Sequence, residues 1–296
     1  MRIILLGLLG LLAACQSQPV GLPLLPAWHA PGAREHPDLG LIVDLRNGQQ
    51  LTPQQLLIQL AAAPQVLVGE QHDNPDHHAL QLWLLRALAT QRAQGSLLLE
   101  MLVPKQQAAV DQVRAGYAKG QAPADLYQAL QWQPNWDWGV YGALVGYAVQ
   151  QPWPLQSANL DRSEIMQIYA QQPGLAGNAS SAPLVREVLL QQIRESHCDL
   201  LPESQLPAML AVQQQRDRRM AERLRDAPEP ALLFAGAFHV RRDLGVPLHL
   251  QDLGAADGTL VLVLAEAGSA VSEGQGDFVW YTAAQPEEDH CAALRK

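Results

Sequence analysis

Short apolar runs alternate along the chain with segments in which apolar residues recur every three or four positions. The runs predict buried strands, and the recurring pattern predicts amphipathic helices. The predicted strands are Leu41–Leu45, Gln49–Leu51, Val66–Gly69, Ser96–Leu99, Trp153–Ala158, Ala231–Phe238, Thr259–Ala265 and, as an edge strand, Phe278–Thr282. The predicted helices are Pro53–Ala63, a segment starting at Pro75, most of Pro104–Gln151, Ser163–Gln171, Leu184–His197 and Ser204–Ala227.

The order of these elements predicts the fold class. A strand, a helix and a second strand at this spacing form a βαβ unit with parallel strands. Hydrophobic residues make up 48% of the 296 residues, enough to bury a sizeable core. We therefore predict an α/β domain over residues 41–284, with a largely parallel central sheet flanked by helices and a helical insertion at about 104–227.

The N-terminus predicts a lipoprotein. Arg2 precedes an apolar segment, Ile3–Leu12, that is too short to span a bilayer. The residues that follow, Leu12-Ala13-Ala14-Cys15, resemble the bacterial lipobox, in which the chain is cleaved before a cysteine that becomes lipidated. The resulting division is a signal peptide over 1–14, a tether rich in Pro, Gly and Ala over 15–40, and a polar tail over 285–296. Gln16, in place of Asp, predicts anchoring at the outer membrane of a Gram-negative cell envelope.

Charge and cysteine content narrow the range of partners. The formal net charge is -9, and the Lys and Arg residues form no long block, which argues against nucleic-acid binding. The charged run Arg216–Arg225 is interpreted as a solvated helix face. An anionic ligand remains compatible, because one or two Arg residues suffice to bind it. Beyond Cys15, the thiols of Cys198 and Cys291 could form a disulfide in an oxidising compartment or stay separate.

Polar side chains follow four of the predicted strands. They are Glu70, His72, Glu100, Asn159, Asp161 and His239. Because the carboxyl ends of parallel strands meet at one edge of the sheet, where ligands bind in open α/β folds, we expect these groups to share a site. A second candidate feature is the Trp132–Trp138 segment, whose three tryptophans could stack on a flat ligand or simply pack a loop onto the domain.

Three chemistries fit the strand-end groups. A divalent metal such as zinc or manganese could be held by Glu70, His72, Glu100 and His239. The same four residues could act without a metal in ester or peptide hydrolysis, although no GxSxG motif supplies a serine nucleophile. Alternatively, a His or Tyr could ligate haem iron while Arg162, Arg241 or Arg242 pairs the propionates. A buried network that only fixes the strand ends is the remaining interpretation.

Five segments together match the motifs of one family. They are GEQHDNPDHHALQ at Gly69–Gln81, LLLEML at Leu97–Leu102, WDWxxY at Trp136–Tyr141, RDRRMAERL at Arg216–Leu224 and AGAFHVRRDLGVP at Ala235–Pro247. Over roughly Val43–Leu264 the chain thereby resembles the ChaN-type haem-binding uptake lipoproteins, which share a superfamily with Tiki proteases and erythromycin esterases. The resemblance implies cofacial haem at a dimer interface, with Tyr ligation and His participation.

The resemblance sets the functional expectations. Tyr141 is the predicted haem ligand, with Tyr147 and Tyr169 left open. The other predicted haem contacts are His72, His77, His78, His239 and Arg241. We predict a haem-binding lipoprotein that hands haem to transport proteins and forms a homodimer on binding it, and that is not primarily an enzyme. A hydrolase using the strand-end groups is the alternative, and a lipoprotein that serves only protein partners is a third reading.

Overall fold

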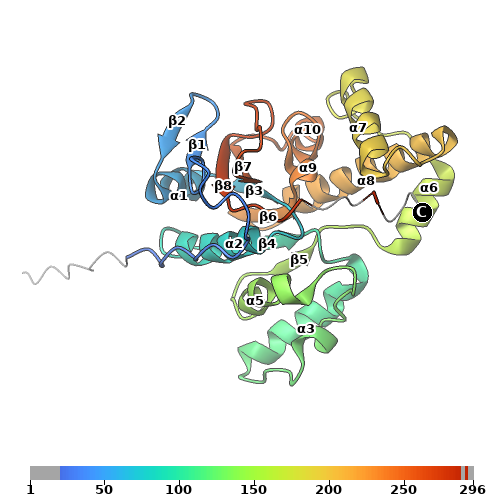
Figure 1. Ribbon diagram of the computed structural model, residues 1–296. Coiled ribbons are helices and arrows are strands. Elements are labelled where there is room, and N and C mark those ends of the chain that lie inside the picture. Colours follow the sequence, from blue (N-terminus) through green and yellow to red (C-terminus); the bar gives the residue numbers. More distant parts are fainter. Residues whose placement is uncertain (1–20, 288–290, 293–296) are drawn as a thin grey trace, which may run out of the picture.

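The computed structural model describes residues 21–287 and 291–292 (Figure 1). The predicted signal peptide, Cys15 and the start of the tether lie outside these residues, as does most of the polar tail. The described part of the tether lies on the domain, where Trp83 Nε1 donates a hydrogen bond to the carbonyl of Pro23 at 2.9 Å. The backbone of Ala30 likewise donates to Asp76.

The described strands form one sheet in the order β2-β1-β8-β7-β3-β6-β4-β5. The strands are β1 (Ile42–Asp44), β2 (Gln49–Leu51), β3 (Gln65–Glu70), β4 (Ser96–Leu99), β5 (Leu155–Ser157), β6 (Ala231–Gly236), β7 (Thr259–Glu266) and β8 (Phe278–Thr282). From β8 to β5 all neighbours are parallel, whereas β1 and β2 form an antiparallel hairpin at one edge. This confirms the predicted α/β class.

The helices cover both faces of this sheet (Figure 1). They are α1 (Pro53–Ala62), α2 (Pro75–Leu88), α3 (Gln107–Ala118), α4 (Leu126–Ala129), α5 (Trp138–Ala148), α6 (Arg162–Gln171), α7 (Pro183–Ser196), α8 (Leu206–Arg225), α9 (Ala237–Val240) and α10 (Val246–Asp252), with 3₁₀ turns η1 (Pro104–Gln106) and η2 (Glu203–Gln205). The two long helical segments are separated by β5, which returns to the sheet edge beside β4.

Two hydrophobic cores lie on opposite faces of the sheet. Because successive side chains of a strand point to opposite faces, Val66 and Val68 pack with α1, α2, α3 and α5, whereas Leu67 packs with α8 and α10. A third, smaller core joins α7 to the start of α8 through Leu189, Ile193 and Leu206. The helices α6, α7 and α8 extend away from the sheet on one side of the molecule (Figure 1).

Two boundaries differ from the sequence prediction. Phe278–Thr282 was expected at an edge, but β8 is paired on both sides, with β7 and β1. The edge prediction was wrong because the pattern within one strand does not reveal that β1, from the other end of the chain, pairs with its second side. Strand β6 ends at Gly236, and the next residues turn into α9, so His239 lies on a helical turn.

The loop after α7 is joined to the C-terminal segment by a disulfide. Cys198 and Cys291 are bonded, with their Cα atoms 5.6 Å apart. Of the two possibilities that the sequence left open, a disulfide or two separate thiols, the structure shows the disulfide. Within the described ranges, no helix combines the length and the apolar character needed to cross a bilayer.

Candidate functional site at the carboxyl edge

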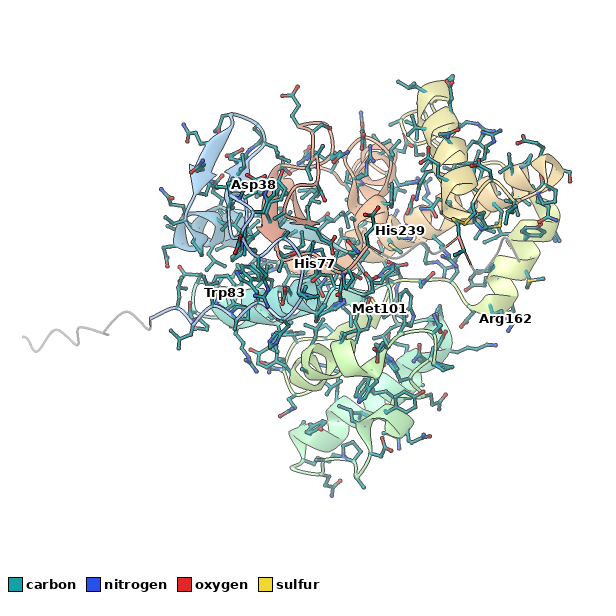
Figure 2. All side chains as sticks on the ribbon, in the orientation of Figure 1. Asp38, His77, Trp83, Met101, Arg162 and His239 are labelled. Atoms are coloured by element: carbon teal, nitrogen blue, oxygen red, sulfur yellow. A yellow bond between two sulfur atoms is a disulfide. The ribbon has the colours of Figure 1, made fainter. Side chains whose placement is uncertain are left out.

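The carboxyl ends of β3, β4 and β6 bring the predicted polar groups together. Glu70 is the last residue of β3, Glu100 directly follows β4, and His239 lies on the turn after β6. Figure 2 labels His239 and Met101, the neighbour of Glu100, near the middle of the molecule at this edge. The sequence-based expectation that parallel strands place these groups in one region is therefore matched by the geometry.

The first half of the cluster is built around the Glu70 carboxylate. His72 Nδ1 lies 2.6 Å from Glu70 Oε1, and the Tyr141 hydroxyl donates to the same oxygen at 3.0 Å. The other oxygen, Oε2, is buried with no hydrogen-bond partner in the described residues. Burial opposes protonation of His72, but its hydrogen bond to Glu70 and the charge of that carboxylate outweigh this and raise its pKa. Glu70 thus fixes the orientation of the His72 ring.

The second half is a relay of Asp217, His239 and Glu100. His239 Nδ1 lies 2.5 Å from Asp217 Oδ1, and its Nε2 lies 3.3 Å from Glu100 Oε1. Burial alone would keep His239 neutral, but the two carboxylates outweigh that effect and raise its pKa to about 10. Burial likewise opposes ionisation of Glu100, yet the charge of His239 lowers its pKa to about 2. The relay is therefore an imidazolium clamped between two carboxylates at neutral pH.

Asp217 is a member of the cluster that sequence reasoning missed. It belongs to the charged run of α8 that we interpreted as a solvated face, but its side chain is fully buried against the sheet. The signal was available: Asp217 stands in helical register with the apolar residues Met220, Ala221 and Leu224, which are also buried. A carboxylate on the apolar stripe of a helix indicates a buried partner of opposite charge.

Gly236 joins the two halves. Its backbone N–H donates to Glu100 Oε2 at 2.8 Å. A Cβ atom at this position would come within 2.9 Å of His72 Nε2 and Cε1. Only glycine therefore allows the end of β6 to lie against the His72 ring, which explains the glycine before the AFH segment.

The mouth of the cluster is lined by His72 and aromatic side chains. The His72 side chain is 44% exposed, and within the described chain its Nε2 has no hydrogen-bond partner. Its ring meets that of Trp136 edge-on, with centroids 4.9 Å apart. Phe238 is 47% exposed, with the Arg241 guanidinium 5.8 Å from its ring centroid. His72 is therefore the member of the cluster that solvent or a ligand can reach.

Two of the predicted haem contacts, His77 and His78, lie in the interior. His77 is fully buried; its Nδ1 accepts from the backbone of Gln71, and its Nε2 lies 2.9 Å from Thr282 Oγ1. Burial lowers its pKa to about 3. His78 Nε2 contacts the carbonyl of His72 at 3.0 Å. Because these nitrogens are engaged, neither His77 nor His78 is placed to contact haem.

Tyr141 is also buried and engaged. Its side chain is among the largest fully buried ones, and its hydroxyl is bonded to Glu70. Burial, followed by the charge of Glu70, raises its pKa well above the usual range. The prediction of Tyr141 as haem ligand does not fit this environment, because a ligand phenolate would lie beside a carboxylate.

The remaining predicted groups have other partners. Asn159 supports the site from behind, since its amide donates to the carbonyl of Glu100 at 3.0 Å. Asp161 is the N-cap of α6. Arg241 pairs with Asp243 and Arg242 with Asp277, so Arg242 lies outside the cluster.

The cluster is not built as a metal site. In the part of the chain that the structure describes, no group of three or more His, Cys, Asp or Glu side chains is arranged to hold a metal ion. The metal alternative for Glu70, His72, Glu100 and His239 is therefore not supported. The physical reason is that Glu100 and His239 already satisfy each other, and Gly236 occupies the second oxygen of Glu100.

Helix α6 offers a different kind of surface. It contains three aliphatic or thioether side chains and a tyrosine, yet none of its residues is buried. Arg162, Ile165, Met166 and Tyr169 recur at positions one turn apart and so share one side of the helix. The opposite side, with Glu164 and Ile168, faces a cavity of about 250 Å³ against α8. The shared side thus projects from the domain, with Arg162 far from the sheet (Figure 2).

The side chains at the two ends of this α6 surface are free. In the described residues the Tyr169 hydroxyl and the Arg162 guanidinium have no hydrogen-bond or ion-pair partner. Met166 is 58% exposed. An apolar helix face flanked by an unengaged phenol and an unengaged guanidinium makes this side of α6 a candidate interaction surface.

The sequence and fold of the chain are similar to those of known proteins. Residues 56–250 match the model of the family described as haem-binding uptake, Tiki superfamily, ChaN. A structure of ChaN of Campylobacter jejuni with cofacial haem binding is 29% identical, with a TM-score of 0.75, over 82% of this chain and 97% of that one. No curated protein matches the sequence.

Two further structures are more distant. An erythromycin esterase mutant, EreC, in its open conformation is 14% identical, with a TM-score of 0.46, over 86% of this chain and 85% of that one. RRSP, a MARTX toxin effector domain from Vibrio vulnificus, is 13% identical, with a TM-score of 0.43, over 78% of this chain and 37% of that one.

Proposed function

Because the chain belongs to the haem-binding uptake family of the Tiki superfamily, ChaN, we propose that it binds haem and passes it on within an iron-uptake system. The observation that carries this proposal is its similarity, over 82% of its length, to a ChaN structure with cofacial haem. Haem would supply an iron that needs an axial ligand and two propionates that need cationic partners.

The outward side of α6 is the surface that fits haem best. Ile165 and Met166 offer an apolar contact for the flat macrocycle. Tyr169 can turn its unengaged phenol to the iron, and Arg162 can pair a propionate. The proposed ligand is therefore Tyr169, one of the tyrosines that the sequence left open, in place of the buried Tyr141.

A haem lying flat on α6 would leave its other face uncovered. A second copy of the chain with its own haem would cover that face and give the cofacial pair that the family resemblance implies. The homodimer is thus part of the proposal and depends on haem. Its support is the projection of α6 from the domain, which leaves room for a second copy (Figure 1).

Haem titration tests the proposal. The chain from Gln16 onward, titrated with haemin, should show a saturable shift of the Soret band, and Tyr169→Phe should weaken binding about tenfold or more. Tyr141→Phe is the matched control and should keep the affinity. A titration that never saturates, or a loss confined to Tyr141→Phe, would refute the α6 site. Transfer of bound haem to apomyoglobin tests whether the protein releases what it binds.

Membrane anchoring is the second part of the proposed function. The lipobox ending at Cys15 supports a lipid-anchored protein of the cell envelope, which would hold the protein near membrane transporters. Replacing Cys15 by Ala should move the protein from the membrane fraction to the soluble fraction. Unchanged fractionation would contradict the anchor without touching the haem proposal.

A second candidate function rests on the cluster at the carboxyl edge. His72 has an open Nε2, a ring fixed by Glu70 and an exposed side chain, which is the arrangement of a general base. A hydrolase that used it would lose activity on esters or peptides in Glu70→Gln. If purified protein free of contaminants turns over none of these substrates, the cluster serves the fold alone.

A further inference from the structure

One end of the molecule is formed by two segments without charged residues, although the chain as a whole carries a net charge of -9. We call it the N-terminal pole and define it as the segment 21–28 together with α1. No Asp, Glu, Lys or Arg occurs between Asn47 and Gly69 or between Gly21 and Ala33. The pole is nevertheless a surface, since Leu24 is 94% and Ile58 is 56% exposed. Among the described residues, the charged side chains bonded to α1 are cations, since Arg46 donates to Gln59 and Arg92 to the carbonyl of Ala61.

Helix α2 holds the two parts of the pole in place. Its Trp83 binds the carbonyl of Pro23, and the Arg92 guanidinium just beyond it binds the carbonyl of Ala61 in α1. Leu22 packs on the same core as α1. Figure 1 shows the N-terminal segment and α1 at the same end of the molecule, opposite α6 and α7. The exposed apolar side chains are therefore carried by a firmly packed part of the fold.

The position of the lipobox brings this pole close to the bilayer. Five residues lie between Cys15 and Gly21. Even in a fully extended chain, the six steps from Cys15 to Gly21 span only about 20 Å. A domain tethered so closely must turn the end that bears Gly21 toward the membrane, and the side chains next along the chain are the exposed Leu24 and Leu25.

We propose that the N-terminal pole docks on the lipid bilayer that holds the Cys15 anchor, with Leu24 and Ile58 in the headgroup region. This inference rests on the proposed lipidation. Apolar side chains gain free energy when they leave water for the headgroup boundary. The lack of acidic side chains in these two segments matters as much, because an anionic bilayer would repel the net negative chain unless a face without carboxylates meets it.

Docking in this orientation would present the α6 surface to the opposite side. Arg162, at the start of α6, lies at the end of the molecule far from the N-terminal segment (Figure 2). The side of α6 with Tyr169 would then face away from the membrane, where a second copy or a haem-carrying partner can reach it. The lipid surface and the haem surface would thus be kept apart by the length of the sheet.

Spin labelling of the full lipidated protein tests the docking. Single labels at Leu24→Cys and Ile58→Cys are compared with Met166→Cys, whose native side chain is exposed to nearly the same extent as Ile58. The protein is reconstituted in vesicles of phosphatidylethanolamine with phosphatidylglycerol as the minor component. We expect labels 24 and 58 to lose collisions with a water-soluble nickel complex and to gain collisions with oxygen, while label 166 stays unchanged.

The outcomes separate the docking from the anchor. If the protein floats with the vesicles but all three labels behave alike, the docking is wrong and the anchor stands. A protein that does not float overturns both. Spin–spin broadening at labels 24 and 58 would mean that a second copy covers the pole, and it would also overturn the proposal. Glu at both positions, in a protein that still floats, should abolish any insertion of a label placed at Leu25.

Discussion

The carboxyl-edge cluster and the outward side of α6 differ in how far their polar side chains are buried and paired. In the cluster, Glu70, Glu100, Asp217 and His239 are buried, and each has at least one polar atom bonded to another side chain, although Glu70 Oε2 and Asp217 Oδ2 have no hydrogen-bond partner in the described residues. On α6, Tyr169 and Arg162 have no partner within the described chain, and no residue is buried. A tyrosine occurs in each region, but only Tyr169 has a free hydroxyl. The contrast shows that polar residues in a recognisable motif can have a structural role. A candidate ligand-binding surface can lie in a segment without such a motif.

The largest expected effect comes from breaking the relay. Asp217→Ala leaves the His239 imidazolium buried with a single carboxylate, and removing one partner of a buried pair costs about 3–5 kcal/mol. We expect this loss in the free energy of unfolding by urea. Asp226→Ala on the same helix is the matched control, because its pair with Arg225 is exposed and should contribute less than about 1 kcal/mol. Equal effects of the two substitutions would show that the relay is not a buried ion pair.

The pH dependence of stability sharpens the same contrast. His239 has its pKa raised from 6.5 to about 10, so its contribution is complete below pH 6.5 and is lost as the pH rises through 10. Glu100 has its pKa lowered from 4.5 to about 2, so its contribution is present above pH 4.5 and is lost as the pH falls through 2. We therefore expect stability to fall by a few kcal/mol between pH 7 and 10.

The control for this pH profile is His239→Gln, which lacks the titrating group. Its melting temperature, measured by circular dichroism over the same range, should be lower at pH 7 and should decline less toward pH 10. Parallel profiles for the two proteins would assign the pH dependence to other groups and would leave the charge of His239 unsupported.

The smallest expected effect compares the two tyrosines. Tyr141→Phe removes a buried hydrogen bond to the Glu70 carboxylate and should lower the free energy of unfolding by about 1.5–3 kcal/mol. Tyr169→Phe removes a hydroxyl without a partner in the described residues and should leave stability unchanged. Chemical denaturation of both variants without haem measures this. A destabilised Tyr169→Phe would reveal a structural partner and would weaken its proposed role as ligand.

Much of the site could be predicted because the C-terminal residues of parallel strands lie at the same edge of the sheet. Glu70, His72, Glu100 and His239 each follow an apolar run, and the run lengths alone placed them together. What could not be predicted was their accessibility. His72 is exposed, whereas His77 and His78 are buried, although all three stand in the same short motif. That difference depends on which side of α2 packs on the sheet, and on Thr282, which the motif does not contain.

The sequence by itself determined the α/β class, the parallel strands and the convergence of polar groups at one edge, because hydrophobic periodicity and strand direction are local properties. The tertiary structure alone decided that Asp217 completes the relay, that β8 lies inside the sheet and that Tyr141 is locked to Glu70. It also decided that, among the residues that the structure describes, none packs over one side of α6 closely enough to bury it. These outcomes depend on contacts between residues distant in sequence, and burial, pairing and pKa are properties of such contacts.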